Sequence, residues 1–203
     1  FFMCADQQSA AAFSDHMASD WNETDTLHDT TIHQILDLAD IRSGVHVLDV
    51  ACGTGVLFPY YLSRNVSCIS GVDLSGDMIS QAKKKFQQSQ IHLIRADILA
   101  CRFDSPFDRC MVYHALSYFP DPAQLLRRLA ICVKPGGRLT LAQCFGRTQE
   151  QRPPSLPDTA ELARILAPWF LVDIQLSDGE KYVISGLRND APAVSAVPAT
   201  DKR

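Results

Sequence analysis

The stretch V-H-V-L-D-V-A-C-G-T-G at residues 45–55 decides the fold class of this chain. Its first six residues are rich in valine and predict a buried strand. Gly53 and Gly55 follow directly, and residues 56–64 have the apolar spacing of a helix, with Pro59 near its first turn. The stretch therefore predicts a strand, a glycine loop and a helix in succession.

Strands and helices alternate through the rest of the chain. Further strands are expected in six ranges: 66–72, 91–94, 107–113, 138–144, 170–176 and 182–187. The last two ranges flank a Ser-Asp-Gly-Glu turn and predict an antiparallel hairpin. Right-handed crossovers between the earlier strands would place helices on both faces of a parallel sheet. The predicted fold class is α/β: a doubly wound, mostly parallel seven-stranded sheet with a C-terminal antiparallel hairpin.

Several residues are expected to mark the ends of the helices. Ser75, Asp121 and Asp158 are predicted to be N-terminal caps, because their side-chain oxygens can accept hydrogen bonds from the first turn. The segment Lys134-Pro-Gly-Gly137 is expected to end the helix that follows Asp121, before the strand at 138–144.

The length of 203 residues is typical of one domain and leaves no room for a separate substrate domain. Residues 1–40 contain helical patterns at 9–20 and 26–40 and are expected to form an N-terminal lid or cap. Residues 41–188 are expected to form the ligand-binding domain. Residues 189–203 contain two prolines and no periodicity, which predicts a flexible tail.

Composition excludes several classes of function. The chain has 19 Lys and Arg against 23 Asp and Glu, a formal net charge of −4, so no nucleic-acid partner is expected. No apolar run approaches the roughly 18 residues of a membrane span, and residues 1–4 do not resemble a signal peptide, so a cytoplasmic protein is expected. The seven cysteines show no C-x-x-C spacing, and no metal site is predicted.

Carboxylates stand at the ends of the first three predicted strands. In an open parallel sheet, ligands bind at the carboxyl ends of the strands. Asp73 after the second strand can accept both hydroxyls of a ribose, and Asp97 after the third can accept the amine of adenine. Asp49 beside the glycine loop favours a cationic group, such as a sulfonium or an ammonium, over a pyrophosphate. Phe58 also replaces the third glycine of the G-x-G-x-x-G dinucleotide fingerprint.

With these residues, the chain resembles the class I S-adenosylmethionine-dependent methyltransferases, which have a Rossmann-like fold. Within them it looks most like the small-molecule enzymes of ubiquinone and menaquinone biosynthesis. The resemblance covers roughly residues 30–187, and five segments carry it: VLDVACGTG at 47–55, GVDLSGDMI at 71–79, IRADIL at 94–99, FDRCMVYHALSYFPD at 107–121 and VKPGGRLTL at 133–141. It implies S-adenosyl-L-methionine as cofactor, S-adenosyl-L-homocysteine as product, a small-molecule acceptor, and a monomer or homodimer.

The resemblance also implies which residues would line the site. For the cofactor these are Asp49, Ala51, Cys52, Gly53, Gly55, Asp73, Leu74, Met78, Asp97, Ile98 and Tyr113. For the acceptor pocket they are Trp21, which would belong to the lid, His114 and Tyr118.

Methyl transfer from a sulfonium is an in-line displacement, so holding donor and acceptor in line and excluding water can supply much of the catalysis. A dedicated base is not required. If there is one, His114 is the candidate, because it lies at the end of the fourth strand and histidine titrates near neutral pH. The alternative is that His114 orders the loop or lines the pocket.

Three other functions stay open at the level of sequence. A protein that binds the cofactor without turnover, as a sensor or regulatory subunit, would use the same pocket. A methyltransferase with a protein or RNA acceptor is a further alternative. An NAD-dependent dehydrogenase is disfavoured by Phe58 and by the context of Asp97.

Overall fold

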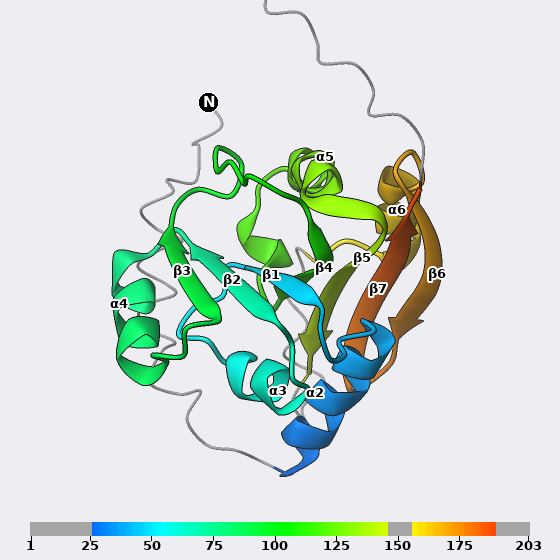
Figure 1. Cartoon of the computed structure of the whole chain (residues 1–203). Helices are drawn as coiled ribbons and strands as arrows, with labels where there is room; N and C mark the ends of the chain where they lie inside the picture. The colour runs from blue at the N-terminus through cyan, green and yellow to red at the C-terminus, as the bar shows by residue number, and fades with distance from the viewer. Residues whose placement is uncertain (1–25, 146–155, 190–203) are drawn as a thin grey trace, which may run out of the picture.

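The computed structural model describes residues 26–145 and 156–189. They form one seven-stranded sheet with the order β3-β2-β1-β4-β5-β7-β6 (Figure 1). Strands β1 to β5 run parallel, whereas β7 runs antiparallel to both β5 and β6. The predicted fold class is therefore confirmed. The strands are β1 His46–Val50, β2 Cys68–Asp73, β3 Ile91–Arg95, β4 Phe107–Tyr113, β5 Val133–Cys144, β6 Phe170–Ser177 and β7 Lys181–Arg188.

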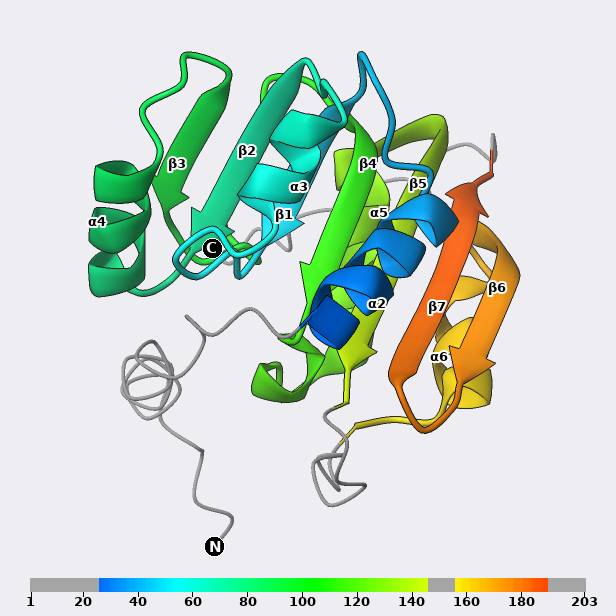
Figure 2. The same ribbon diagram turned by 90° about the horizontal axis from the view of Figure 1, so that it is seen from below.

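Helices cover both faces of the sheet. Figure 2 shows α2 and α3 in front of the strands and α5 and α6 behind them. None of the helices in the described ranges is long and apolar enough to cross a membrane. The helices are α2 Thr26–Leu38, α3 Phe58–Ser63, α4 Gly76–Lys85, α5 Pro122–Cys132 and α6 Thr159–Leu166, with a short 3-10 helix, η2 Leu116–Tyr118.

The two faces of the sheet bury two separate apolar clusters. Cys110 and Val112 of β4 face the cluster that contains residues of α5 and α6, while Met111 and Tyr113 face the one that contains residues of α2, α3 and α4. This alternation follows from the two-residue period of a strand. Because both faces are covered, apolar residues of the central strands point to both sides of the sheet, as in Val47-Leu48 of β1 and Cys110-Met111-Val112 of β4.

The expected caps are partly confirmed. The Ser75 hydroxyl accepts a hydrogen bond from the Met78 amide at 3.2 Å, and Asp121 accepts one from Gln124 at 3.0 Å. Asp158 occupies the N-cap position of α6, but its side chain makes no capping hydrogen bond, which corrects the prediction.

The boundary between α5 and β5 also differs from the prediction. α5 ends at Cys132 and β5 begins at Val133, so Lys134–Gly137 lies inside the strand and does not end the helix. The pairing with β4 jumps across this segment, from Val133 to Arg138. Gly136 has a φ of +70°, a left-handed conformation that glycine adopts without strain. The segment therefore bulges out of the strand, and the strand continues on both sides of it.

Part of the N-terminal prediction lies outside the described residues. This holds for the helix expected at 9–20 and for Trp21; of the expected tail, only Asn189 is described. The described helix α2 packs Ile32, Ile35 and Leu36 into the core, and it lies against β5 and β7.

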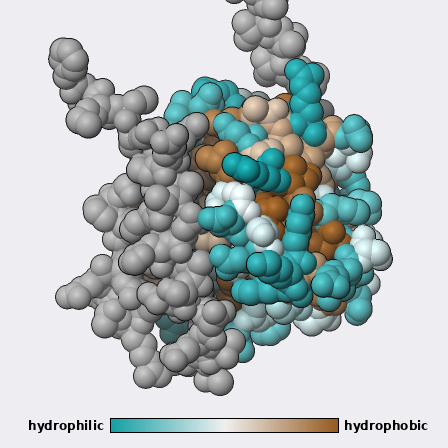
Figure 3. Space-filling view, turned by 90° about the vertical axis from the view of Figure 1, so that its left-hand side faces the viewer, coloured by the Kyte–Doolittle hydropathy of each residue, from teal (hydrophilic) through white to brown (hydrophobic). Residues whose placement is uncertain are grey.

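The edge of the sheet at β3 and α4 has a mixed surface. Figure 3 shows hydrophilic side chains around an apolar area on this face. Strand β3 is short, and Ile91, Leu93 and Ile94 are only partly buried.

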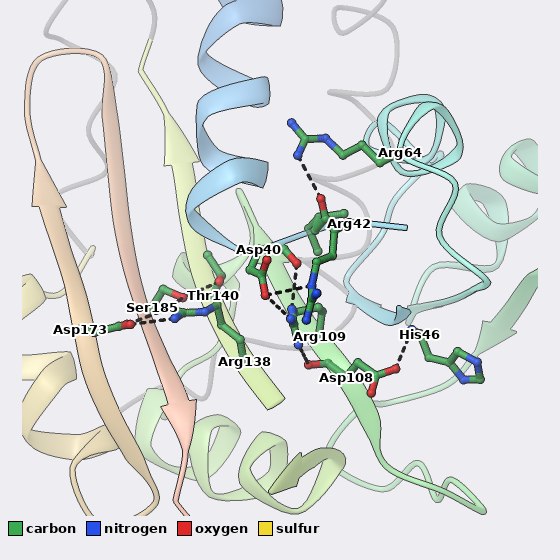
Figure 4. A network of polar contacts seen from close by, with 11 residues as sticks. Asp40, Arg42, His46, Arg64, Asp108, Arg109, Arg138, Thr140, Asp173 and Ser185 are labelled. Carbon is green, nitrogen blue, oxygen red and sulfur yellow. Dashed lines mark hydrogen bonds and ion pairs between the residues drawn. The ribbon is translucent and has the colours of Figure 1, made fainter. Parts of the chain in front are cut away.

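The amino ends of the strands carry a network of ion pairs and hydrogen bonds (Figure 4). Arg109 of β4 is buried; it forms an ion pair with Asp40 and donates a hydrogen bond to the Asp40 carbonyl at 2.9 Å. Asp108 accepts hydrogen bonds from the His46 amide and from the Lys134 ammonium, both at 2.8 Å. These contacts tie β1, β4 and β5 together at the end of the sheet opposite the predicted ligand site.

Candidate functional site

The structure brings the three predicted carboxylates to one edge of the sheet. Asp49 and Asp73 lie at the carboxyl ends of the paired strands β1 and β2. Asp97 follows the end of β3, where the Ala96 amide donates a hydrogen bond to the Asp73 carbonyl at 3.0 Å. This is the edge at which open α/β sheets bind their ligands.

Asp73 is held by the backbone of two loops. Its side chain is 9% exposed, Oδ2 accepts a hydrogen bond from the Gly53 amide at 2.8 Å, and Oδ1 accepts one from the Ser75 amide at 2.8 Å. The carboxylate thus joins the glycine loop to the N-terminus of α4. Each oxygen can accept more than one hydrogen bond, so both can also receive a ligand hydroxyl.

Asp49 is buried below the glycine loop and is 3% exposed. Burial raises the pKa of Asp49 from 3.8 to about 8; the nearby Tyr61 hydroxyl opposes this shift, and the negative charge of Asp73 adds to it. Tyr61 is also buried, and its hydroxyl makes no hydrogen bond of ordinary geometry within the described ranges. A cation near Asp49 would favour the ionised form of this carboxyl group.

The glycine loop has an unusual backbone. Ala51, Gly53 and Gly55 all have positive φ values, of +54°, +55° and +85°. A Cβ on Gly55 would lie 2.7 Å from side-chain atoms of Phe58 and Phe86, whereas a Cβ on Gly53 would meet nothing within 4 Å. Gly55 is therefore required for packing, while Gly53 borders open space at the carboxyl ends of the strands.

The other residues expected at the cofactor differ in exposure. Leu74 is exposed beside Asp73, but the side chains of Cys52, Met78 and Ile98 are buried. The backbone around Asp97 is fixed, because its Oδ1 accepts a hydrogen bond from the Leu99 amide at 2.9 Å.

Tyr113 and His114 lie at the end of β4 and contact the last residue of β5. The Tyr113 hydroxyl donates a hydrogen bond to Cys144 Sγ at 3.1 Å, and His114 Nε2 accepts one from the Cys144 amide at 3.0 Å. The two rings meet edge to face, with centroids 4.4 Å apart. His114 Nε2 could take a proton from an acceptor only if its bond to Cys144 broke. The geometry therefore favours the alternative in which His114 orders the loop.

Tyr118 is exposed on η2. Partial burial and the negative charge of Asp73 raise the pKa of Tyr118. Its helix η2 follows the carboxyl end of β4 directly. The structure thus places Tyr118 on the same edge of the sheet as Asp73. No group of histidine, cysteine and carboxylate side chains within residues 26–145 and 156–189 could hold a metal ion.

Two residues near this edge were not predicted from the sequence. The Tyr60 hydroxyl donates a hydrogen bond to Asp29 Oδ1. Tyr60 belongs to α3 and Asp29 to α2, 31 residues earlier, and neither stands in a recognisable motif. A polar residue in an otherwise apolar helix segment is the only signal the sequence contains.

Comparisons with known proteins support this description. A family model described as a methyltransferase domain matches residues 47–137. The ubiquinone biosynthesis O-methyltransferase of Coxiella burnetii is 31% identical over 142 residues, which are 66% of this chain and 60% of that protein. The corresponding enzyme of Xylella fastidiosa is 37% identical over 102 residues, which are 48% of this chain and 41% of that protein. This chain spans about 60% of the length of the Coxiella relative.

Two solved structures have the same fold at low sequence identity. The N-methyltransferase NodS from Bradyrhizobium japonicum WM9, in complex with S-adenosyl-L-homocysteine, superposes with a TM-score of 0.68 and 16% identity over 88% of this chain and 98% of that one. Magnesium protoporphyrin IX methyltransferase from Synechocystis PCC 6803, with bound S-adenosylmethionine, gives 0.65 and 17% over 93% of this chain and 100% of that one. With its strand order and its glycine loop, this chain has the fold of these S-adenosylmethionine-dependent methyltransferases, and its residues 47–137 match the methyltransferase domain.

Proposed function

We propose that the protein transfers a methyl group from S-adenosylmethionine to a small-molecule acceptor and releases S-adenosylhomocysteine. One observation carries the proposal: Asp49, Asp73 and Asp97 converge beside a glycine loop that borders open space. This set suits an adenosine joined to a cationic group, because it offers hydrogen-bond acceptors for ribose and adenine and a carboxyl group that favours a cation over a pyrophosphate.

The residues divide the work along the edge of the sheet. Asp73 would accept the ribose hydroxyls, and Asp97 the adenine amine. Asp49 and the backbone of Gly53 would lie beside the amino-acid and sulfonium part. The cofactor supplies an activated methyl group on a sulfonium. The chain has to orient an acceptor in line with it and to exclude water, which suffices for much of the rate enhancement.

The acceptor would enter beyond the methyl group, at the ends of β4 and β5. A small molecule is favoured because the relatives from Coxiella and Xylella are named ubiquinone biosynthesis O-methyltransferases. The structural neighbours differ in acceptor: one is named an N-methyltransferase and another acts on magnesium protoporphyrin IX. The proposal therefore fixes the class of acceptor and not its identity.

Calorimetric titration with S-adenosylmethionine, S-adenosylhomocysteine and NAD tests the cofactor assignment. We expect both adenosyl ligands to bind and NAD not to bind. Asp73→Asn should weaken binding about 10- to 100-fold, because it loses charged hydrogen bonds to the ribose. The matched control is Glu161→Gln, the same chemical change on the exposed first turn of α6. Equal affinity in wild type and Asp73→Asn would contradict the ribose assignment.

The same preparation separates an enzyme from a sensor. S-adenosylhomocysteine formation is followed with a panel of small phenols, alcohols and amines. Turnover with one of them supports the proposal. Tight cofactor binding with no turnover, including with protein and RNA extracts, would favour the non-catalytic alternative.

A further inference from the structure

The hydrogen bond between Tyr60 and Asp29 lies on the acceptor side of the site. Asp29 belongs to the first turn of α2, and Tyr60 to the first turn of α3. Helix α2 lies against β5, and Figure 2 shows it in front of β4 and β5. The Tyr60 ring also meets the edge of His33, with centroids 5.3 Å apart.

Tyr60 packs against the apolar cluster that contains Tyr113 and Cys144, the last residues of β4 and β5. Partial burial, the hydrogen bond to Asp29 and the charges of Asp29 and Cys144 raise the pKa of Tyr60 to about 12. The pKa of Tyr113, at the end of β4, is raised mainly by burial, and the charge of Tyr60 adds to this shift. The pair is thus next to Tyr113 and Cys144, one strand beyond β1 and away from the carboxylates predicted to bind adenosine.

The pair has the chemistry needed to remove a proton. A phenol hydroxyl donates one hydrogen bond and can accept others. Tyr60 donates to Asp29, so its oxygen is oriented to accept, and its side chain is only partly buried. His114 is poorly placed for this task, because its Nε2 already accepts the Cys144 amide.

We propose that Tyr60 and Asp29 form the proton acceptor for a substrate hydroxyl, and hence that the methyl acceptor is a phenol or an alcohol that is not ionised when it binds. This inference rests on the proposed methyltransferase function and extends it to the acceptor.

Methyl transfer and proton transfer are coupled in the proposed step. The acceptor oxygen forms a bond to the methyl carbon while the bond from that carbon to sulfur breaks, and the electron pair of the broken bond stays on sulfur. The acceptor proton passes to the Tyr60 oxygen as the Tyr60 proton passes to the Asp29 carboxylate. The positive charge of the sulfonium and the negative charge of Asp29 are both consumed, and Asp29 later loses its proton to water. No tyrosinate has to form.

Three variants test the pair: Tyr60→Phe, Asp29→Asn, and Asp37→Asn as the matched control. Asp37 lies on the same helix, is 71% exposed and pairs with Arg64. The assays are run at about pH 8. The probes are phenol and catechol, which are mostly protonated at that pH, and 4-nitrophenol, which is largely ionised. The rate of S-adenosylhomocysteine formation is measured with each probe, and the binding of S-adenosylhomocysteine is measured by calorimetry in parallel.

We expect Tyr60→Phe and Asp29→Asn to lower the rate with the protonated phenols about 100-fold or more, the usual contribution of a general base. With 4-nitrophenol the loss should be less than about threefold, because no proton has to be removed. Asp37→Asn should behave as wild type with every probe. Asp29→Asn should also lower the pKa of Tyr60, seen as an earlier rise in tyrosinate absorbance, since a negative charge beside the phenol is removed.

The possible outcomes separate the two proposals. Equal losses with protonated and ionised phenols would show that the pair only holds α2 to α3 and would overturn the inference. Cofactor binding without turnover of any phenol or alcohol by the wild type would also overturn it, while the cofactor assignment stands. Absence of cofactor binding would instead contradict the proposed function itself.

Discussion

At the scale of the single residue, Asp49 is the carboxyl group whose environment is least suited to its charge. Burial outweighs the opposing effect of Tyr61, and the pKa of Asp49 rises to about 8. A native pKa above the unfolded value of 3.8 means that Asp49 stabilises the fold fully below about pH 4. That stability is lost as the pH rises toward 8, because the carboxyl group ionises in the unfolded chain while it stays protonated in the folded protein.

We therefore expect Asp49→Asn to remove one component of the pH dependence of stability. The free energy of unfolding in urea, measured without ligand, should fall for wild type relative to the variant between pH 5 and pH 9. Over this pH range the difference is at most roughly 4 kcal/mol, from about three pH units at 1.4 kcal/mol each. Comparing the two proteins at each pH cancels the titration of all other groups. Parallel pH profiles would show that Asp49 is ionised at low pH in the folded state.

At the scale of the element, the glycine loop combines two different requirements. Gly55 and Gly53 both have left-handed φ values, but only a Cβ at Gly55 would collide with the core, at Phe58 and Phe86. Gly55→Ala should therefore cost about 2–4 kcal/mol of stability, from backbone strain and overpacking together. Gly53→Ala should cost about 1–2 kcal/mol, from backbone strain alone.

Ligand binding should show the opposite order. The Cβ of Gly53→Ala would project into the space beside Asp49 and Asp73, so we expect affinity for S-adenosylhomocysteine to fall at least 10-fold. The protein should remain folded at 20 °C. Gly55→Ala should lose affinity only in proportion to its unfolded fraction. Urea unfolding and calorimetry on the two variants check both orders; a folded Gly53→Ala protein with wild-type affinity would place the ligand elsewhere.

The loop also shows how far local sequence patterns determine an element. The strand, loop and helix around Gly53 and Gly55 were predictable, because apolar periodicity and glycine act over a few neighbouring residues. The bulge at Lys134–Gly137 was not. Pro-Gly-Gly is typical both of a helix end and of a bulge, and pairing with β4, which lies far away in the sequence, decides between them.

At the scale of the whole molecule, the two ends of the parallel strands have separate tasks. Asp49, Asp73 and the glycine loop lie at the carboxyl ends, where a ligand would bind, and ion pairs hold the amino ends together. The carboxylates at the carboxyl ends could be predicted from the sequence, because each stands at or just after one of the first three strands. The sequence did not predict the ion pairs or the Tyr60–Asp29 contact, because these join helices and strands whose relative placement depends on packing.

The amino-end network should therefore affect stability without affecting the ligand. Arg138 forms a two-bond pair with Asp173, with both N–O distances 2.7 Å, and also donates to Ser185 at 3.1 Å. The Arg138 side chain is 10% exposed and that of Asp173 is 37% exposed. Removal of the carboxylate leaves a buried, unpaired guanidinium, whereas removal of the guanidinium leaves a carboxylate that water can reach.

The asymmetry of burial predicts the order of two variants. Asp173→Ala should cost about 2–4 kcal/mol in urea unfolding, and Arg138→Met about 1–2 kcal/mol, since methionine fills part of the volume of the arginine stem. Both should bind S-adenosylhomocysteine with wild-type affinity under conditions where they are folded. If Arg138→Met were the more costly change, water would not be reaching Asp173. If either variant lost affinity while folded, the two ends of the sheet would be coupled through the strands.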